Sequence, residues 1–196
     1  MNKLLLYLSI FMIGLIVNSC QNDEIGEKQI NIDDASLNKF SYVLSQYRQK
    51  IIPIIEKEEG SRSNGGYVEF TEEERIILEQ EYKILALNGR ELFMALDFTE
   101  EELNNIYYKG NTDDIALAAV FYSIFSENKL ETRAITGNVY ADCALAVAGF
   151  DVFTCLEGGG KVMVKKMLKT LAGKLLGPVG MALTIAEYTL CVGGFG

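Results

Sequence analysis

The fold is indicated by two stretches of the chain that open alike, "FTEEERIILEQEY" at residues 70–82 and "FTEEELNNIYYKG" at residues 98–110. Each places a Thr three residues before a Glu, Thr71 before Glu74 and Thr99 before Glu102. This spacing is typical of a capping box, in which the two side chains satisfy backbone N–H groups at the start of an α-helix. The likeness ends after five residues, so repeated capping chemistry explains it better than a duplicated helical hairpin. We therefore expect helices that begin at Thr71 and Thr99.

The residue pattern in the rest of the acidic N-terminal part also predicts helices. We expect one over residues 36–58, interrupted or ended near Pro53 because proline removes a backbone hydrogen bond. A further helix is expected from about Asn111 to about Glu127. The chain contains only two prolines, and its apolar residues recur mostly at steps of three and four. This periodicity predicts helices throughout and no sheet of consequence.

Charge divides the chain into two parts. Residues 20–160 contain 12 Lys and Arg against 26 Asp and Glu, whereas residues 161–196 contain five Lys and one Glu. The net charges are about −14 and about +4. The segment "KLETRAITGN" at residues 129–138 has the polar composition of a boundary. We expect a signal peptide at 1–19, a tether at 20–35, an acidic helical domain at 36–136 and an apolar region at 137–196.

The sequence pattern of the C-terminal region predicts three helices rich in Gly and Ala. Residues 140–157, "YADCALAVAGFDVFTCLE", are apolar on nearly every side. Residues 161–176 are amphipathic, with an apolar face opposite the lysines. That face comprises Val164, Met167, Leu168, Leu171 and Leu175, and the lysines are Lys165, Lys166 and Lys169. A third helix starts at Gly177 and Pro178. The expected fold is an all-α helical bundle with an acidic N-terminal part and an apolar three-helix C-terminal part.

The N-terminus has the pattern of a signal peptide. A basic residue, Lys3, precedes an apolar run of fourteen residues, which is shorter than the roughly 20 that a membrane-spanning helix needs. The end of the run resembles the lipobox of bacterial lipoproteins in Val17, Ser19 and Cys20, and departs from it at Asn18. This resemblance implies a type II signal peptide, removal of residues 1–19 and lipidation of Cys20. The alternative is an ordinary secretory signal that ends near a cysteine.

The residues after Cys20 are polar and suit a tether between a lipid anchor and a folded domain. "QNDE" at residues 21–24 resembles the acidic signal with which some Gram-negative bacteria export lipoproteins to the cell surface. The resemblance implies a protein anchored by palmitate or a similar acyl chain in the outer membrane, with its domain facing the exterior. A mobile acidic tether is the alternative interpretation of the same four residues.

Three cysteines remain once Cys20 is acylated. An exported protein meets an oxidising compartment, where thiols pair. On one helix, Cys143 and Cys155 would lie about 18 Å apart, too far for a disulfide, so Cys191 is the expected partner in any bridge. If the C-terminal helices run up, down and up, Cys155 and Cys191 lie at the same end. We predict a Cys155–Cys191 disulfide with Cys143 as a buried thiol; the alternative is three packed thiols.

The sequence offers no recognisable catalytic, metal or cofactor site. The chain contains no His, the commonest general base and metal ligand. The acidic clusters "NIDD" and "NTDD" do not continue as calcium-binding loops. "GGGK" at residues 158–161 lacks the spacing and the Ser or Thr of a phosphate-binding loop. We expect no enzyme activity, no cofactor and no nucleic-acid partner.

Two resemblances concern the tail. Gly177-Pro178-Val179-Gly180, followed by Tyr188 and Cys191, resembles the Cys-containing tails of uncharacterised secreted bacterial proteins. The acidic part followed by a Cys-bearing helical tail resembles bacteriocin precursors. The sequence therefore supports two candidate functions. The first is a non-enzymatic surface lipoprotein that binds another protein or ligand. The second is a carrier of a membrane-active C-terminal segment, released by cleavage near Arg133.

Overall fold

The computed structural model describes residues 34–62, 70–107, 114–127, 138–149, 155, 160–171 and 176–193. This part of the chain consists of helices and contains no strand, which confirms the all-α fold. The helices are α2 (Asp34–Arg62), α3 (Glu72–Met94), α4 (Glu100–Tyr107), α5 (Asp114–Glu127), α6 (Val139–Ala148), α8 (Gly160–Leu171) and α9 (Gly177–Gly193).

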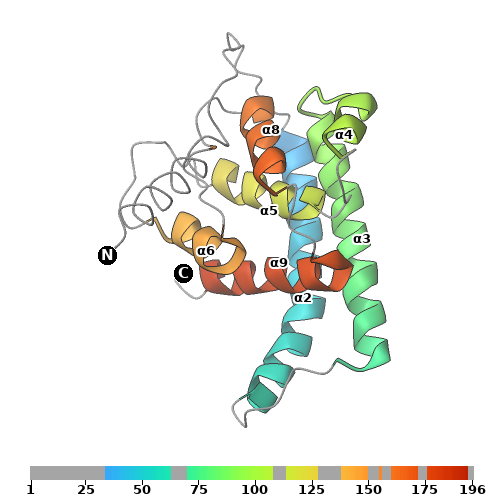
Figure 1. The fold of residues 1–196 in the computed structure, drawn as a ribbon, viewed down its shortest axis with the longest axis vertical. Helices are drawn as coiled ribbons and strands as arrows, with labels where there is room; N and C mark the ends of the chain where they lie inside the picture. The colour runs from blue at the N-terminus through green and yellow to red at the C-terminus, as the bar shows by residue number, and fades with distance from the viewer. Residues whose placement is uncertain are drawn as a thin grey trace, which may run out of the picture.

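Helix α5 is the centre of the bundle (Figure 1). Every residue from Asp114 to Phe125 is buried. Helices α2, α3, α6, α8 and α9 all contact it. A helix that is apolar on all sides must be covered on all sides. One hydrophobic cluster runs from Phe40 to Tyr188, so helices of the acidic and the apolar regions share a single core.

Helices α2 and α3 form an antiparallel hairpin beside α5. Three ion pairs of 2.5 to 2.6 Å join them: Lys39–Glu91, Lys50–Glu81 and Lys57–Glu74. Exposed pairs of this kind each contribute little to stability. Helix α9 contacts both helices of the hairpin and crosses them in Figure 1. The Tyr47 hydroxyl of α2 donates a buried hydrogen bond of 2.6 Å to the carbonyl of Ala182 in α9.

The expectation that α2 is interrupted or ends near Pro53 is wrong, because the helix continues to Arg62. Proline leaves one carbonyl of the preceding turn without its helical donor. Pro53 is exposed, so water can satisfy that carbonyl. On the opposite side of the helix, Ile51 and Ile55 are buried in the core and hold the backbone in place.

Both predicted capping boxes are present. The Thr71 hydroxyl accepts from the N–H of Glu74 at 3.2 Å, and the Glu74 carboxylate accepts from the N–H of Thr71 at 2.9 Å. Thr99 and Glu102 make the same two bonds, at 3.1 and 3.0 Å. The expected helix start near Asn111 lies outside the described residues, which resume at Asp114.

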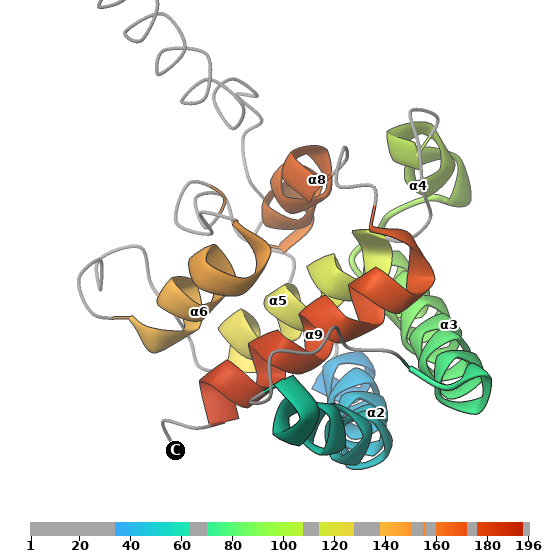
Figure 2. The same ribbon diagram turned by 60° about the horizontal axis from the view of Figure 1, so that its bottom comes forward.

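The predicted up, down and up arrangement of the C-terminal helices is wrong. Helix α6 ends at Ala148, and Gly149 follows in the left-handed conformation with φ 57°. Glycine adopts this conformation without the Cβ penalty, which is why it ends helices. Residues 140–157 are therefore not one helix. Helix α6 packs against α9, whereas α8 packs against α5 (Figure 2).

Candidate functional site

The predicted lipidation site, Cys20, lies outside the described residues. The structure does place the three other cysteines. Cys143 of α6 and Cys191 of α9 form a disulfide, with 5.8 Å between their Cα atoms. The predicted Cys155–Cys191 bridge is wrong. Its premise was a continuous helix that carries Cys143 and Cys155, and the break at Gly149 removes that premise.

Cys155 is the buried thiol, the role predicted from the sequence for Cys143. Its side chain is fully excluded from solvent. The Sγ atom lies 3.9 Å from the Thr170 hydroxyl of α8, which itself donates to the carbonyl of Lys166 at 3.0 Å. A buried thiol in such surroundings packs as a small apolar side chain and is protected from oxidants.

A charged cluster joins α4 to α8. Glu102 accepts from Lys161 Nζ at 2.6 Å and from Lys165 Nζ at 3.0 Å. Lys161 also donates to the carbonyl of Asp97 at 2.6 Å. Both ammonium groups lie over the ring of Phe98, at 5.0 and 5.9 Å from its centroid, within the range of a cation–π interaction. The cluster links the acidic part of the chain to its basic tail.

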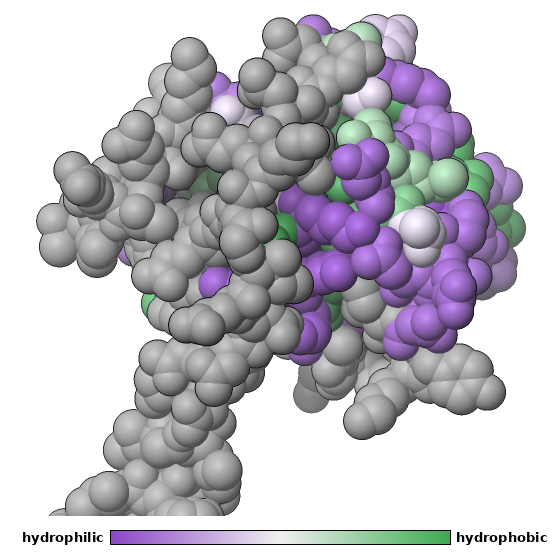
Figure 3. All heavy atoms as spheres, turned by 90° about the horizontal axis from the view of Figure 1, so that it is seen from above, coloured by the Kyte–Doolittle hydropathy of each residue, from purple (hydrophilic) through white to green (hydrophobic). Residues whose placement is uncertain are grey.

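This cluster was only partly predicted. The sequence predicts the role of Glu102 as a cap, but for Lys165 it predicts only a position opposite the apolar face of its helix. The hydrogen bond from Lys161, followed by that from the Thr99 N–H, lowers the pKa of Glu102 to about 2. The carboxylate is therefore ionised at neutral pH and unsuited to act as a general acid. Figure 3 views the end of the molecule at which α4 and α8 lie, and its described surface is largely hydrophilic.

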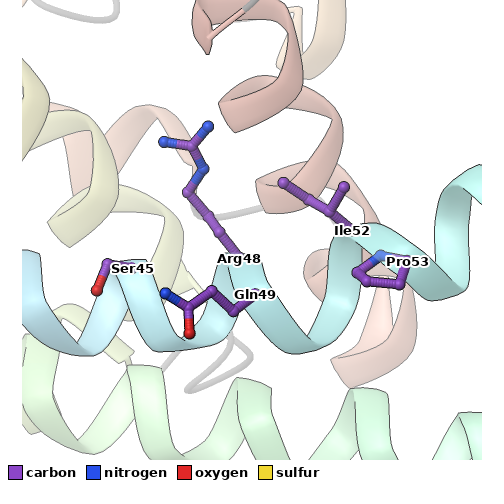
Figure 4. A pocket seen from close by; sticks show the side chains of 5 residues that line it. All are labelled: Ser45, Arg48, Gln49, Ile52 and Pro53. Atoms are coloured by element: carbon purple, nitrogen blue, oxygen red, sulfur yellow. The ribbon is translucent and has the colours of Figure 1, made fainter.

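A hollow of about 370 Å³ lies beside α2, lined by Ser45, Arg48, Gln49, Ile52 and Pro53. Figure 4 shows that all five side chains come from one stretch of this helix. A catalytic pocket brings together polar groups from several elements, with an acid or base near a nucleophile. The only charged side chain in the lining is Arg48, so this hollow has no group to act as a base at neutral pH.

Two further kinds of site are absent from the described part of the chain. No group of three Cys, Asp or Glu side chains there is placed to hold a metal ion. Within the same residues, no helix combines the length and the apolar character needed to cross a membrane.

An exposed apolar face on α3 is the strongest candidate for a binding site. We call it the α3 outer face and define it by Ile76, Ile77, Ile84, Leu87 and Met94. Their exposed fractions range from 39% for Ile77 to 65% for Leu87. The opposite side of the same helix is buried in the core through Leu78, Tyr82, Leu85, Gly89, Leu92 and Phe93. Figure 2 shows α3 at the edge of the bundle. Contiguous exposed apolar surface of this kind marks interaction sites.

This face was not predicted from the sequence, although the apolar residues that form it are visible there. Residues 76–94 carry apolar side chains on two sides of the helix. A helix that packs on one side needs apolar residues on that side alone. Which set faces the core depends on contacts with α2, α5 and α9, which are distant in sequence.

No family model, curated protein or solved structure matches this chain. In the tail, Gly177 has φ 64° at the start of α9, Tyr188 is buried and Cys191 is in the disulfide. Each of these residues thus has a structural role in the bundle.

Proposed function

We propose that this protein is a non-enzymatic lipoprotein of the bacterial outer membrane, whose helical domain binds another protein. The observation that carries the binding role is the α3 outer face. A helix of a soluble bundle buries its apolar side chains against the core and exposes polar ones. Helix α3 buries one apolar side against the core, but it also exposes five large apolar side chains on its solvent side.

Export is supported by the Cys143–Cys191 disulfide. Disulfides persist in the periplasm and at the cell surface and are rare in the cytosol of mesophiles. The signal-peptide pattern that ends at Cys20 agrees with this compartment. An acylated Cys20 would tether the domain through the acidic segment that follows, without a membrane-spanning helix.

The alternative, a carrier of a membrane-active tail, has less support. A membrane-active helix needs its apolar face free to enter the lipid. In α8 that face is buried through Met163, Val164, Met167, Leu168 and Leu171. Lys161 and Lys165 are held by Glu102. Release of the tail would also have to separate α9 from α2 and α3.

Metabolic labelling with palmitate tests the anchor. The full chain should incorporate label in a Gram-negative host, and Cys20→Ala should not. The matched control is Cys155→Ala, which changes a cysteine within the folded domain and should leave labelling intact. Mass spectrometry of the mature N-terminus should find acylated Cys20. An unlabelled wild-type chain, or a mature protein that begins elsewhere, overturns the lipoprotein proposal.

Leakage of a dye from anionic vesicles separates the two functions. The intact protein, and the protein cleaved near Arg133, should both leave the vesicles sealed. Leakage that appears only after cleavage would instead establish the tail as membrane-active.

A further inference from the structure

We propose that the α3 outer face binds α3 of a second copy of this chain, antiparallel and around a two-fold axis. The face has the seven-residue period of a coiled-coil seam. Ile77, Ile84 and Glu91 occupy one set of positions, and Gln80, Leu87 and Met94 occupy the set three residues later. All six side chains are exposed or half-exposed in the single chain.

The two polar positions of this seam fix the direction of pairing. In an antiparallel pair, each position of the first set faces a position of the second set. With the axis between residues 85 and 86, the layers are Ile77 with Met94, Ile84 with Leu87, and Glu91 with Gln80. Every apolar side chain then meets an apolar one, and the amide of Gln80 donates to the carboxylate of Glu91. Parallel pairing would instead place Glu91 against Glu91, which repels.

The charge of the surface also suits a second copy. The chain as a whole has a formal net charge of −9, which opposes self-association. Residues 76–94 are nearly neutral, with three Glu against one Lys and one Arg. Glu91 is already paired with Lys39 of α2 at 2.5 Å, and Arg90 with Glu100 of α4. Repulsion between two such faces is therefore small.

The same charges argue against a lipid surface as the occupant. Helices that lie on anionic membranes carry Lys and Arg on the borders of their apolar face. The α3 outer face is bordered by Glu79 and Glu81 as well as by Lys83. This inference rests on the proposed binding role and is independent of the lipid anchor.

Cysteine crosslinking in cells that express the full chain tests the pairing. Two differently tagged chains are co-expressed, one with Ile77→Cys and one with Met94→Cys, and oxidised with copper phenanthroline. The mixture should give a crosslinked heterodimer on a non-reducing gel. Each variant alone should not, because residue 77 of one copy would lie about 26 Å from residue 77 of the other at 1.5 Å per residue. If each variant crosslinks with itself and the co-expressed pair gives no heterodimer, the pairing is parallel and the proposal is overturned.

Substitutions in the middle of the face supply a second measurement. Leu87→Asp should lower the crosslink yield at least about tenfold, since burial of a Leu side chain is worth more than a factor of ten in affinity. Leu145→Asp is the matched control, because Leu145 on α6 is also exposed, and it should leave the yield unchanged. Gln80→Lys should raise the yield by pairing with Glu91, and Gln80→Glu should lower it. Resistance to protease shows that each variant is folded.

The outcomes separate this inference from the proposed function. A crosslink between the chain and another protein, with no dimer, overturns the two-fold pairing and leaves the binding role intact. A folded, palmitate-labelled protein that forms no crosslink at all overturns both the pairing and the binding role, while the anchor stands.

Discussion

Glu102 of α4 pairs with Lys161 of α8 across 59 positions of sequence, with 2.6 Å between Oε2 and Nζ. The same carboxylate completes the capping box with Thr99. One side chain thus sets the start of a helix and fixes that helix to another one. Because Lys161 and Lys165 also contact Phe98, the first two turns of α8 are held to the segment that leads into α4.

Glu102→Gln should make the protein less sensitive to acid. The pKa of Glu102 is lowered to about 2 from the ordinary value of 4.5. A carboxyl whose pKa is lower in the folded state stabilises the protein at pH values above its unfolded pKa. That contribution is lost as the pH falls from about 4.5 toward 2. The variant should therefore be less stable than the wild type at neutral pH, and the difference should shrink in this window.

Urea denaturation at several pH values measures this effect. Glu101→Gln is the matched control, since Glu101 is an exposed neighbour outside the cluster. The control should keep the pH dependence of the wild type. If the free energy of unfolding changes equally with pH in the wild type and in Glu102→Gln between pH 4.5 and 2, the role given to this carboxylate is contradicted.

Loss of either cap should weaken the fold. Thr99→Ala and Thr71→Ala each remove a hydroxyl that accepts from a backbone N–H at the start of a helix. The expected cost is about 1 kcal/mol in the free energy of unfolding. Thr→Ser at the same positions retains the hydroxyl and should cost less. An alanine variant as stable as the wild type would show that the cap at that position is replaced by water.

The helices could be predicted largely from local chemistry. The capping boxes at Thr71 and Thr99, and the start of the last helix at Gly177 and Pro178, depend on residues within one turn of each other. These helix starts can therefore be predicted from the neighbouring residues alone. The continuation of α2 through Pro53 is different, because burial of Ile51 and Ile55 against distant helices outweighs the local effect of proline.

The packing of these helices could not be predicted in the same way. Amphipathic patterns show that a helix has an apolar face, but not which neighbour covers it. Helix α8 packs on α5 rather than on α6, and Lys165 reaches Glu102 rather than water. The disulfide was mispredicted because Gly149 was not recognised as a helix end, although glycine is the commonest residue at that position.

Gly89→Ala should destabilise the contact between α3 and α5. A Cβ at residue 89 would lie 2.8 Å from the Cβ of Ala119 and 3.1 Å from Cγ2 of Ile115. Overpacking of a core typically costs 1–3 kcal/mol. Alanine regains about 1 kcal/mol of helix propensity. We therefore expect a net loss of about 1 kcal/mol in the free energy of unfolding.

Exchange of the two side chains provides the control for this prediction. The double variant Gly89→Ala with Ala119→Gly restores the number of methyl groups between the helices, and it should recover most of the lost stability. If Gly89→Ala alone is more stable than the wild type, α3 and α5 lie further apart than the structure places them.

The last prediction concerns the Cys143–Cys191 disulfide, which joins α6 to α9 across 48 positions of sequence. By loop-closure entropy, a bridge of this span stabilises the folded state by roughly 4 kcal/mol. Cys143→Ser and Cys191→Ser should therefore each unfold at lower urea concentration than the wild type. A reducing agent should lower the stability of the wild type and leave both variants unchanged.

Cys155→Ser distinguishes this bridge from the one expected from sequence. The buried Cys155 lies outside the disulfide, so its replacement should leave the sensitivity to reducing agent intact. Peptide mapping without reduction should recover one crosslinked pair, Cys143 with Cys191. If Cys155→Ser instead abolishes the effect of the reducing agent, Cys155 is the partner of Cys191. That result would also count against the packing of α6 on α9, because a Cys143–Cys191 disulfide requires these two helices to lie side by side.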